Sequence, residues 1–121
     1  LLAIALATMT APAWSQATLV SLEDGIEAST AAVSLPESVP ARWSFRACPS
    51  CTLMNVDVDE RTEFFIGRQP VSFAVLQKYA ARGAAGLDIF SDPGTKRVTR
   101  VILRAELDAA DRVRSEAPPK R

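Results

Sequence analysis

The residues with the clearest chemical potential in this chain are its two cysteines, which belong to the loop Cys48-Pro49-Ser50-Cys51. The first and fourth residues of a β-turn lie within about 7 Å of each other between Cα atoms, which overlaps the separation that a disulfide requires. Proline at the second position presets the backbone for such a turn. The spacing therefore predicts a β-turn that is stapled by its own two cysteines.

Two other kinds of chemistry remain open for this pair. A C-x-x-C motif can exchange with disulfides, with Cys48 as the attacking thiol and Cys51 as the resolving thiol. Two thiolates can also supply half of a tetrahedral zinc site or hold copper(I) between them. The residues that follow alternate like a strand, whereas thioredoxin-like proteins place the pair at a helix N-terminus. We therefore favour a structural disulfide and expect no metal and no cofactor.

The overall composition excludes some classes of function. The chain contains no histidine, so the commonest general base and metal ligand is missing. Its 14 basic and 14 acidic residues give a formal net charge of zero, and no global charge attracts it to nucleic acid or to an anionic membrane. We therefore expect neither an enzyme built on a histidine nor a nucleic-acid partner.

Two pairs of side chains are candidates for a binding surface. Trp43 and Phe45 share one face of a predicted strand beside the cysteine turn; exposed, they would form a binding patch, but the simpler interpretation is that they cover the core. Arg100 and Arg104 share one face of a later strand, as in the basic grooves that bind single-stranded nucleic acid. An exported protein, however, would not meet its usual nucleic-acid ligand.

The densest acidic group could in principle perform acid–base chemistry or bind calcium. It consists of Asp57, Asp59, Glu60 and Glu63. Its spacing does not match a calcium loop, and no glycine occupies the tight turn that such a loop requires. We interpret the group as a solvated strand face, with Arg61 offsetting part of its charge.

Residues 1–17 have the features of a secretory signal peptide. Leu1 to Ala7 are apolar and uncharged, and Ser15 and Ala17 provide the small −3 and −1 residues of a cleavage site. No methionine or basic segment precedes them, so we expect the signal to begin upstream. The apolar run is interrupted by Pro12 and falls short of the roughly 20 residues that span a bilayer. We therefore predict cleavage after Ala17, no stable membrane insertion, and a periplasmic or secreted protein in an oxidising compartment.

The pattern of the remaining residues predicts mainly strands. Alternation predicts an antiparallel pair over 42–46 and 53–59, a strand over 62–66, and a hairpin between 87–90 and 98–103 whose turn contains Pro93 and a positive-φ Gly94. Asp24-Gly25 predicts an earlier hairpin turn. Ser72 as N-cap and Gly83 beyond the C-terminus predict one helix over about 72–82. Residues 105–121 should be a frayed helix turn and a charged, largely disordered tail.

This order favours an α+β, mainly β fold: a small OB-like or SH3-like, partly closed barrel with one short helix. Residues 53–103 resemble small domains of uncharacterised exported bacterial proteins. The resemblance lies in the T-x-F-x-I strand at Thr62 to Ile66, the short helix, and the closing V-T-x-V strand at Val98 to Val101. It implies no activity and no functional residues.

We therefore expect residues 18–104 to form a single β-rich exported domain, acting as a non-enzymatic binding or structural module of the cell envelope. The sequence identifies no partner, although export suggests an envelope protein. The alternatives are a periplasmic thiol–disulfide redox protein and, after it, a cysteine-based metal-binding protein.

Overall fold

A computed structural model describes residues 23–116 of the chain, and within them the chain forms seven strands and two helices. The predicted signal peptide, residues 1–17, lies outside the described residues. In order, the elements are β1 (Asp24–Ser29), β2 (Ala41–Phe45), β3 (Met54–Val58), β4 (Glu63–Ile66), β5 (Gln69–Val71), α1 (Phe73–Ala80), β6 (Gly86–Ser91), β7 (Val98–Arg104) and α2 (Ala109–Glu116).

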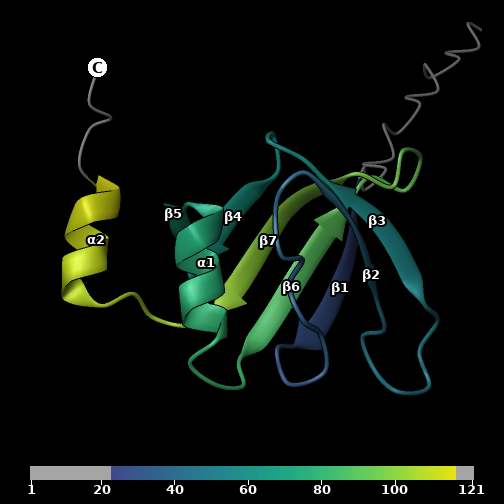
Figure 1. Ribbon diagram of the computed structural model, residues 1–121, viewed down its shortest axis with the longest axis horizontal. Coiled ribbons are helices and arrows are strands. Elements are labelled where there is room, and N and C mark those ends of the chain that lie inside the picture. Colours follow the sequence, from purple (N-terminus) through teal and green to yellow (C-terminus); the bar gives the residue numbers. More distant parts are fainter. Residues whose placement is uncertain (1–22, 117–121) are drawn as a thin grey trace, which may run out of the picture.

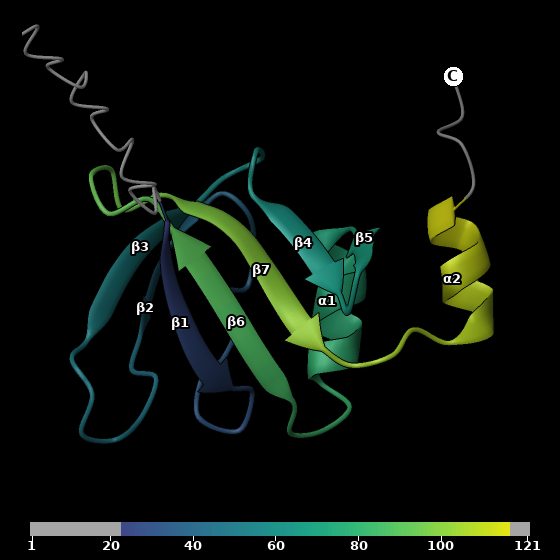
Figure 2. The ribbon, with the colours of Figure 1, turned by 180° about the vertical axis from the view of Figure 1, so that it is seen from behind.

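The strands form a five-stranded sheet of order β1-β6-β7-β4-β5 and a two-stranded sheet of β2 and β3. Both predicted antiparallel pairs, β2–β3 and β6–β7, are confirmed. Helix α1 and the two-stranded sheet lie on one face of the larger sheet, as the front and back views show (Figures 1 and 2). The described residues leave the other face of the larger sheet uncovered (Figure 2).

The predicted barrel is not closed. The segment from β3 to β4 runs along β7. At its start, Asp57 N–H donates to the Lys96 carbonyl at 2.8 Å, and at its end β4 pairs with β7 in parallel. This segment joins the two sheets on one side. On the other side β1 and β2 do not pair within residues 23–116. The connection between them contains Pro36 and Pro40, and proline cannot donate to a ladder.

The connection over residues 30–40 covers the core in place of a barrel strand. Its Val33 is buried, and the Trp43 indole N–H donates to the Ser34 carbonyl at 2.9 Å. From helix α1, the Gln77 side-chain amide donates to the Glu37 carbonyl at 3.1 Å. Side-chain hydrogen bonds thus satisfy part of the irregular backbone that lies over the open side of the sheet.

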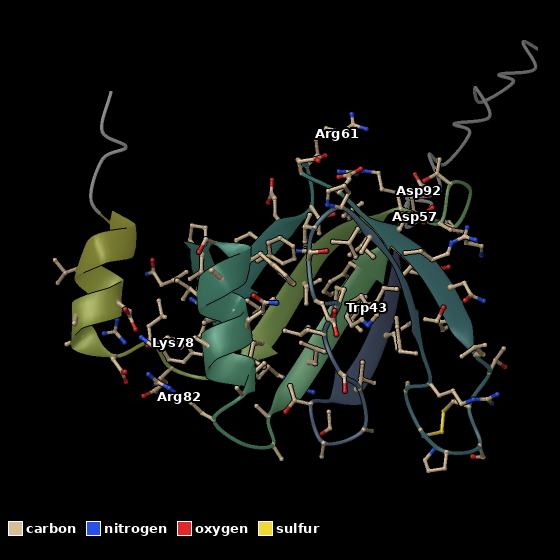
Figure 3. All side chains as sticks on the ribbon, in the orientation of Figure 1. Trp43, Asp57, Arg61, Lys78, Arg82 and Asp92 are labelled. Atoms are coloured by element: carbon tan, nitrogen blue, oxygen red, sulfur yellow. A yellow bond between two sulfur atoms is a disulfide. The ribbon has the colours of Figure 1, made fainter. Side chains whose placement is uncertain are left out.

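The core lies between the inner face of the larger sheet, the β2–β3 pair, α1 and this connection, and Figure 3 shows Trp43 within it. Its most deeply buried side chains are apolar and come from β3, β4, β6 and β7 and from helix α1. They are Val56, Val58, Ile66, Leu76, Leu87, Ile89, Val98, Val101 and Leu103. Alternation explains this in β6 and in the second half of β7, where every second residue points inward, and a register shift between Phe90 and Ser91 places Val98 inward as well.

Helix α1 confirms the predicted helix. The Ser72 hydroxyl accepts a hydrogen bond from Val75 N–H at 3.3 Å, as an N-cap should. The helix ends at Ala80, and Gly83 adopts a φ of 153° just beyond it. Leu76 and Tyr79 are the buried residues of the helix and belong to the core, so these two side chains hold α1 in place.

Local differences from the expectations have simple causes. Asp24 and Gly25 are not a hairpin turn but the first residues of β1, because β6 provides a partner strand from far along the chain. In the β6–β7 turn the positive φ, 63°, belongs to Lys96 and not to Gly94. Where a frayed turn was expected, residues 109–116 form the two-turn helix α2; residues 117–121 lie outside the described part.

Candidate functional site

The cysteine turn lies at the tip of the β2–β3 hairpin. Cys48 and Cys51 form a disulfide with their Cα atoms 5.0 Å apart, and Cys51 N–H donates to the Cys48 carbonyl at 3.0 Å. Pro49 and Ser50 at the tip are exposed. The disulfide is visible as the yellow bond at the end of the hairpin (Figure 3). The predicted stapled turn is therefore present.

The surroundings of the disulfide favour a structural role. Strands β2 and β3 lie on either side of it, and the two helices of residues 23–116 begin far along the chain, at Phe73 and Ala109. The Arg46 guanidinium donates to the Cys51 carbonyl at 3.1 Å, which ties the turn to β2. Metal coordination would need both thiolates, and the disulfide uses both sulfurs.

Trp43 and Phe45 do not form an exposed patch. Their exposed fractions are 4% and 5%, and their ring centroids lie 4.7 Å apart. The pattern of β2 explains this, because its odd-numbered residues face the larger sheet while Arg42 and Ser44 face solvent. The simpler interpretation of the two aromatics, that they cover the core, is the one that the structure supports.

Arg100 and Arg104 lie on the uncovered outer face of the larger sheet. The Arg100 guanidinium stacks on the Phe90 ring at 4.1 Å from its centroid and pairs with Glu23 at 3.2 Å. The Arg104 guanidinium lies over Gly86, so closely that a Cβ there would collide with it, and its Nε is 3.5 Å from Asp88 Oδ2. The two arginines are thus held in place by their neighbours.

The same outer face carries apolar side chains. Register places Phe65 of β4 beside Ile102 of β7, and Ile102 opposite Asp88 of β6. Phe65, Phe90 and Ile102 are all partly exposed. The outer face therefore combines two aromatic rings and an aliphatic side chain with Arg100 and Arg104. Of these residues, the sequence alone had placed only the two arginines on a shared strand face.

The acidic group does not converge into a single site. Asp59 forms a two-point ion pair with Arg97, at 2.6 Å and 3.1 Å, while Asp57 pairs with Arg42 at 3.4 Å. Glu60 and Glu63 are exposed. Within residues 23–116 no cluster of three or more cysteine or carboxylate groups is arranged to hold a metal ion. Asp59 thus joins the β3–β4 turn to the start of β7.

The Asp59–Arg97 pair predicts an acid-sensitive contribution to stability. The Arg97 hydrogen bond lowers the pKa of Asp59 from 3.8 to about 2. A lowered pKa stabilises the folded chain above the unfolded-state value, and this contribution is lost as pH falls from 3.8 toward about 2. The free energy of unfolding of Asp59→Asn should therefore fall less steeply across this interval than that of the wild type.

Denaturant unfolding at a series of pH values measures this difference. Asp57→Asn is the control for the loss of one carboxylate, because it removes a neighbouring ion pair that is largely exposed. Equal pH slopes in the wild type and Asp59→Asn would contradict the assigned role of the pair.

A polar cluster that the sequence analysis missed attaches α2 to α1. The Tyr79 hydroxyl accepts from Asp108 N–H at 2.9 Å and donates to the Asp111 carboxylate. Lys78 and Arg82 pair with Asp111 and Asp108 at 3.2 Å and 3.0 Å. Lys78 belongs to α1, and Arg82 follows just beyond the end of the helix (Figure 3). Burial and the Asp111 contact raise the pKa of Tyr79. Acidic residues after Leu107 are the only sequence signal of this contact.

Several shallow hollows mark the surface of the described residues, and three of them lie beside features described above. One of about 310 Å³ lies between α1 and the connection over 30–40, and one of about 380 Å³ lies between the β4–β5 turn and the start of α2. The third, of about 220 Å³, lies on the outer face over β1 and β6, and Glu27 and Asp88 line it. The sequence analysis did not single out these two acids.

No protein-family model, curated protein or solved structure matches this chain. Geometry, charge and burial are therefore the guides to its function. None of the helices in residues 23–116 is long and apolar enough to cross a membrane.

Proposed function

We propose that this protein is a non-enzymatic binding module of the cell envelope. The observation that carries the proposal is the uncovered outer face of the larger sheet, where Phe65, Phe90 and Ile102 are partly exposed beside Arg100 and Arg104. Aromatic residues and arginine are enriched at protein interfaces, and apolar groups left open to solvent in one place mark a contact surface. A protein partner is the ligand that this surface fits best.

The disulfide supports the non-enzymatic part of the proposal. An attacking cysteine needs a stabilised thiolate, which a helix N-terminus or nearby cations usually provide. The turn lies between two strands, and the neighbouring cation, Arg46, donates to the Cys51 carbonyl. A staple at a hairpin tip therefore fits these contacts better than a redox centre. The apolar segment before Ala17 supports export to an oxidising compartment, where the disulfide would persist.

The competing redox function is tested by a turnover assay. We expect the purified protein to leave the rate of insulin disulfide reduction by dithiothreitol at its uncatalysed value, since neither helix of residues 23–116 begins at the pair and the neighbouring Arg46 donates to a backbone carbonyl. Turbidity of the reduced insulin chains measures the rate. Cys48→Ser, which cannot turn over, provides the matched baseline.

A rate above background that disappears in Cys48→Ser would contradict the binding-module proposal. It would assign Cys48 as the attacking thiol and Cys51 as the resolving thiol of an oxidoreductase.

A further inference from the structure

Strand β1 has an open edge. Among the described residues it pairs with β6 alone, and Thr30 N–H donates to the Ala85 carbonyl at 2.9 Å at the end of that ladder. Hydrogen-bonded pairs alternate along an antiparallel ladder, so the even-numbered residues of β1 bond to β6. The N–H and C=O groups of Gly25 and Glu27 therefore point away from β6, toward an edge on which no other strand of residues 23–116 pairs.

Two carboxylates face each other beside this edge. Glu27 lies directly opposite Asp88 in the register, at a position of the non-hydrogen-bonded type, where side chains are closest. Like charges directly opposite each other destabilise a sheet. Arg104 reaches Asp88 Oδ2 at 3.5 Å, but Asp88 Oδ1 is buried without a hydrogen-bond partner, and no residue in the described part pairs with Glu27. Within residues 23–116 Arg104 thus offsets the charge of Asp88 only in part, and no cation offsets the charge of Glu27.

The outer surface at the same place is hollowed. Gly25 has no side chain, and a Cβ built on it would lie 3.1 Å from the Phe90 ring. The resulting hollow of about 220 Å³ lies over β1 and β6, with both carboxylates at its wall. Nothing in the described residues covers this side of the sheet (Figure 2). A side chain of a strand added beside β1 has room to enter it.

We propose that β1 binds an extended segment of a partner protein as an added strand, with a lysine or arginine of that segment opposite Glu27. The backbone of the segment would bond to Gly25 and Glu27, and its cationic group would lie between Glu27 and Asp88. A second copy of this chain fits the edge poorly, because pairing of β1 with β1 brings acidic strands together. This inference deepens the proposed binding function and rests on it.

The test uses a synthetic peptide of six residues, the length of β1, with alternating threonine and valine and one central lysine. A second peptide has glutamine in place of the lysine. We expect the lysine peptide to bind the disulfide-bonded full chain about tenfold more tightly, because a hydrogen bond to a charged group is worth about that factor. Fluorescence anisotropy measures both affinities, and amide hydrogen exchange should slow at Gly25 and Glu27.

Two variants assign the effect to the carboxylate. Glu27→Gln should abolish the preference for lysine over glutamine, whereas Glu60→Gln, the same change at an exposed glutamate in the β3–β4 turn, should preserve it. Equal binding of the two peptides, or unchanged exchange at Gly25 and Glu27, would overturn the proposal. Exchange at these amides that slows with protein concentration alone would assign the edge to a second copy and also overturn it.

These outcomes are distinct from failure of the proposed function. Insulin turnover by Cys48 would contradict a binding module as such. If the peptides did not bind as expected, β1 would not be the binding edge. The outer face with Phe65, Phe90 and Ile102 would then be the contact surface of the module.

Discussion

Trp43→Ala should lower the free energy of unfolding by about 3–5 kcal/mol, the range typical of a buried aromatic residue. The indole is 4% exposed, contacts Phe45 and donates to the Ser34 carbonyl at 2.9 Å. Its removal leaves a cavity between the two sheets and an unpaired carbonyl in the connection over 30–40. Because that connection takes the place of a barrel strand, we expect Trp43→Ala to destabilise mainly the open side of the fold.

Urea unfolding followed by circular dichroism measures this loss. Trp43→Phe is the matched control, since it keeps an aromatic ring but removes the indole N–H; we expect a smaller loss of about 1–2 kcal/mol. If Trp43→Ala were as stable as the wild type, the ring could not be part of the core.

The second large effect concerns the disulfide. Replacing both Cys48 and Cys51 with serine should lower the free energy of unfolding by about 2 kcal/mol, because the closed loop is short and constrains the unfolded chain only modestly. The β2–β3 ladder, from Ala41 paired with Val58 to Phe45 paired with Met54, should remain. Unfolding in the absence of reductant measures the loss, and backbone amide spectra report on the ladder.

Reduction of the wild type provides an independent check on the same quantity. Dithiothreitol should destabilise the wild type by a similar amount and leave the double serine variant unchanged. A double variant that lost the β2–β3 pairing would show that the staple holds the hairpin together, and the estimate from loop length would be wrong.

The disulfide turn is the part of the candidate site that the sequence predicted most completely. Its two cysteines are three residues apart, and a β-turn brings such residues together whatever the rest of the chain does. The outer-face surface was predicted only in part: alternation placed Arg100 and Arg104 on one strand face, but not Phe65 from β4 beside them. The missing step was the parallel pairing of β4 with β7, which no local pattern indicates.

The binding edge escaped prediction because its members are distant in the sequence. Glu27 and Asp88 are exposed and partly exposed acids in separate strands, and each alone is typical of a solvated strand face. Asp24-Gly25 was interpreted as a turn because these two residues favour one locally. Pairing with β6 instead kept the chain extended there, which placed Gly25 beside Phe90 and Glu27 opposite Asp88.

The sequence by itself determined the local elements: the stapled turn, the β2–β3 and β6–β7 hairpins, and helix α1 with its Ser72 cap. These depend on turn residues, alternation and capping, which act over a few neighbouring residues. Only the tertiary structure decided that the barrel stays open between β1 and β2, that Phe65 joins Arg100 and Arg104 on the outer face, and which acids meet which bases. Those outcomes depend on contacts between segments far apart in the chain, whose register is set by the burial of a shared core.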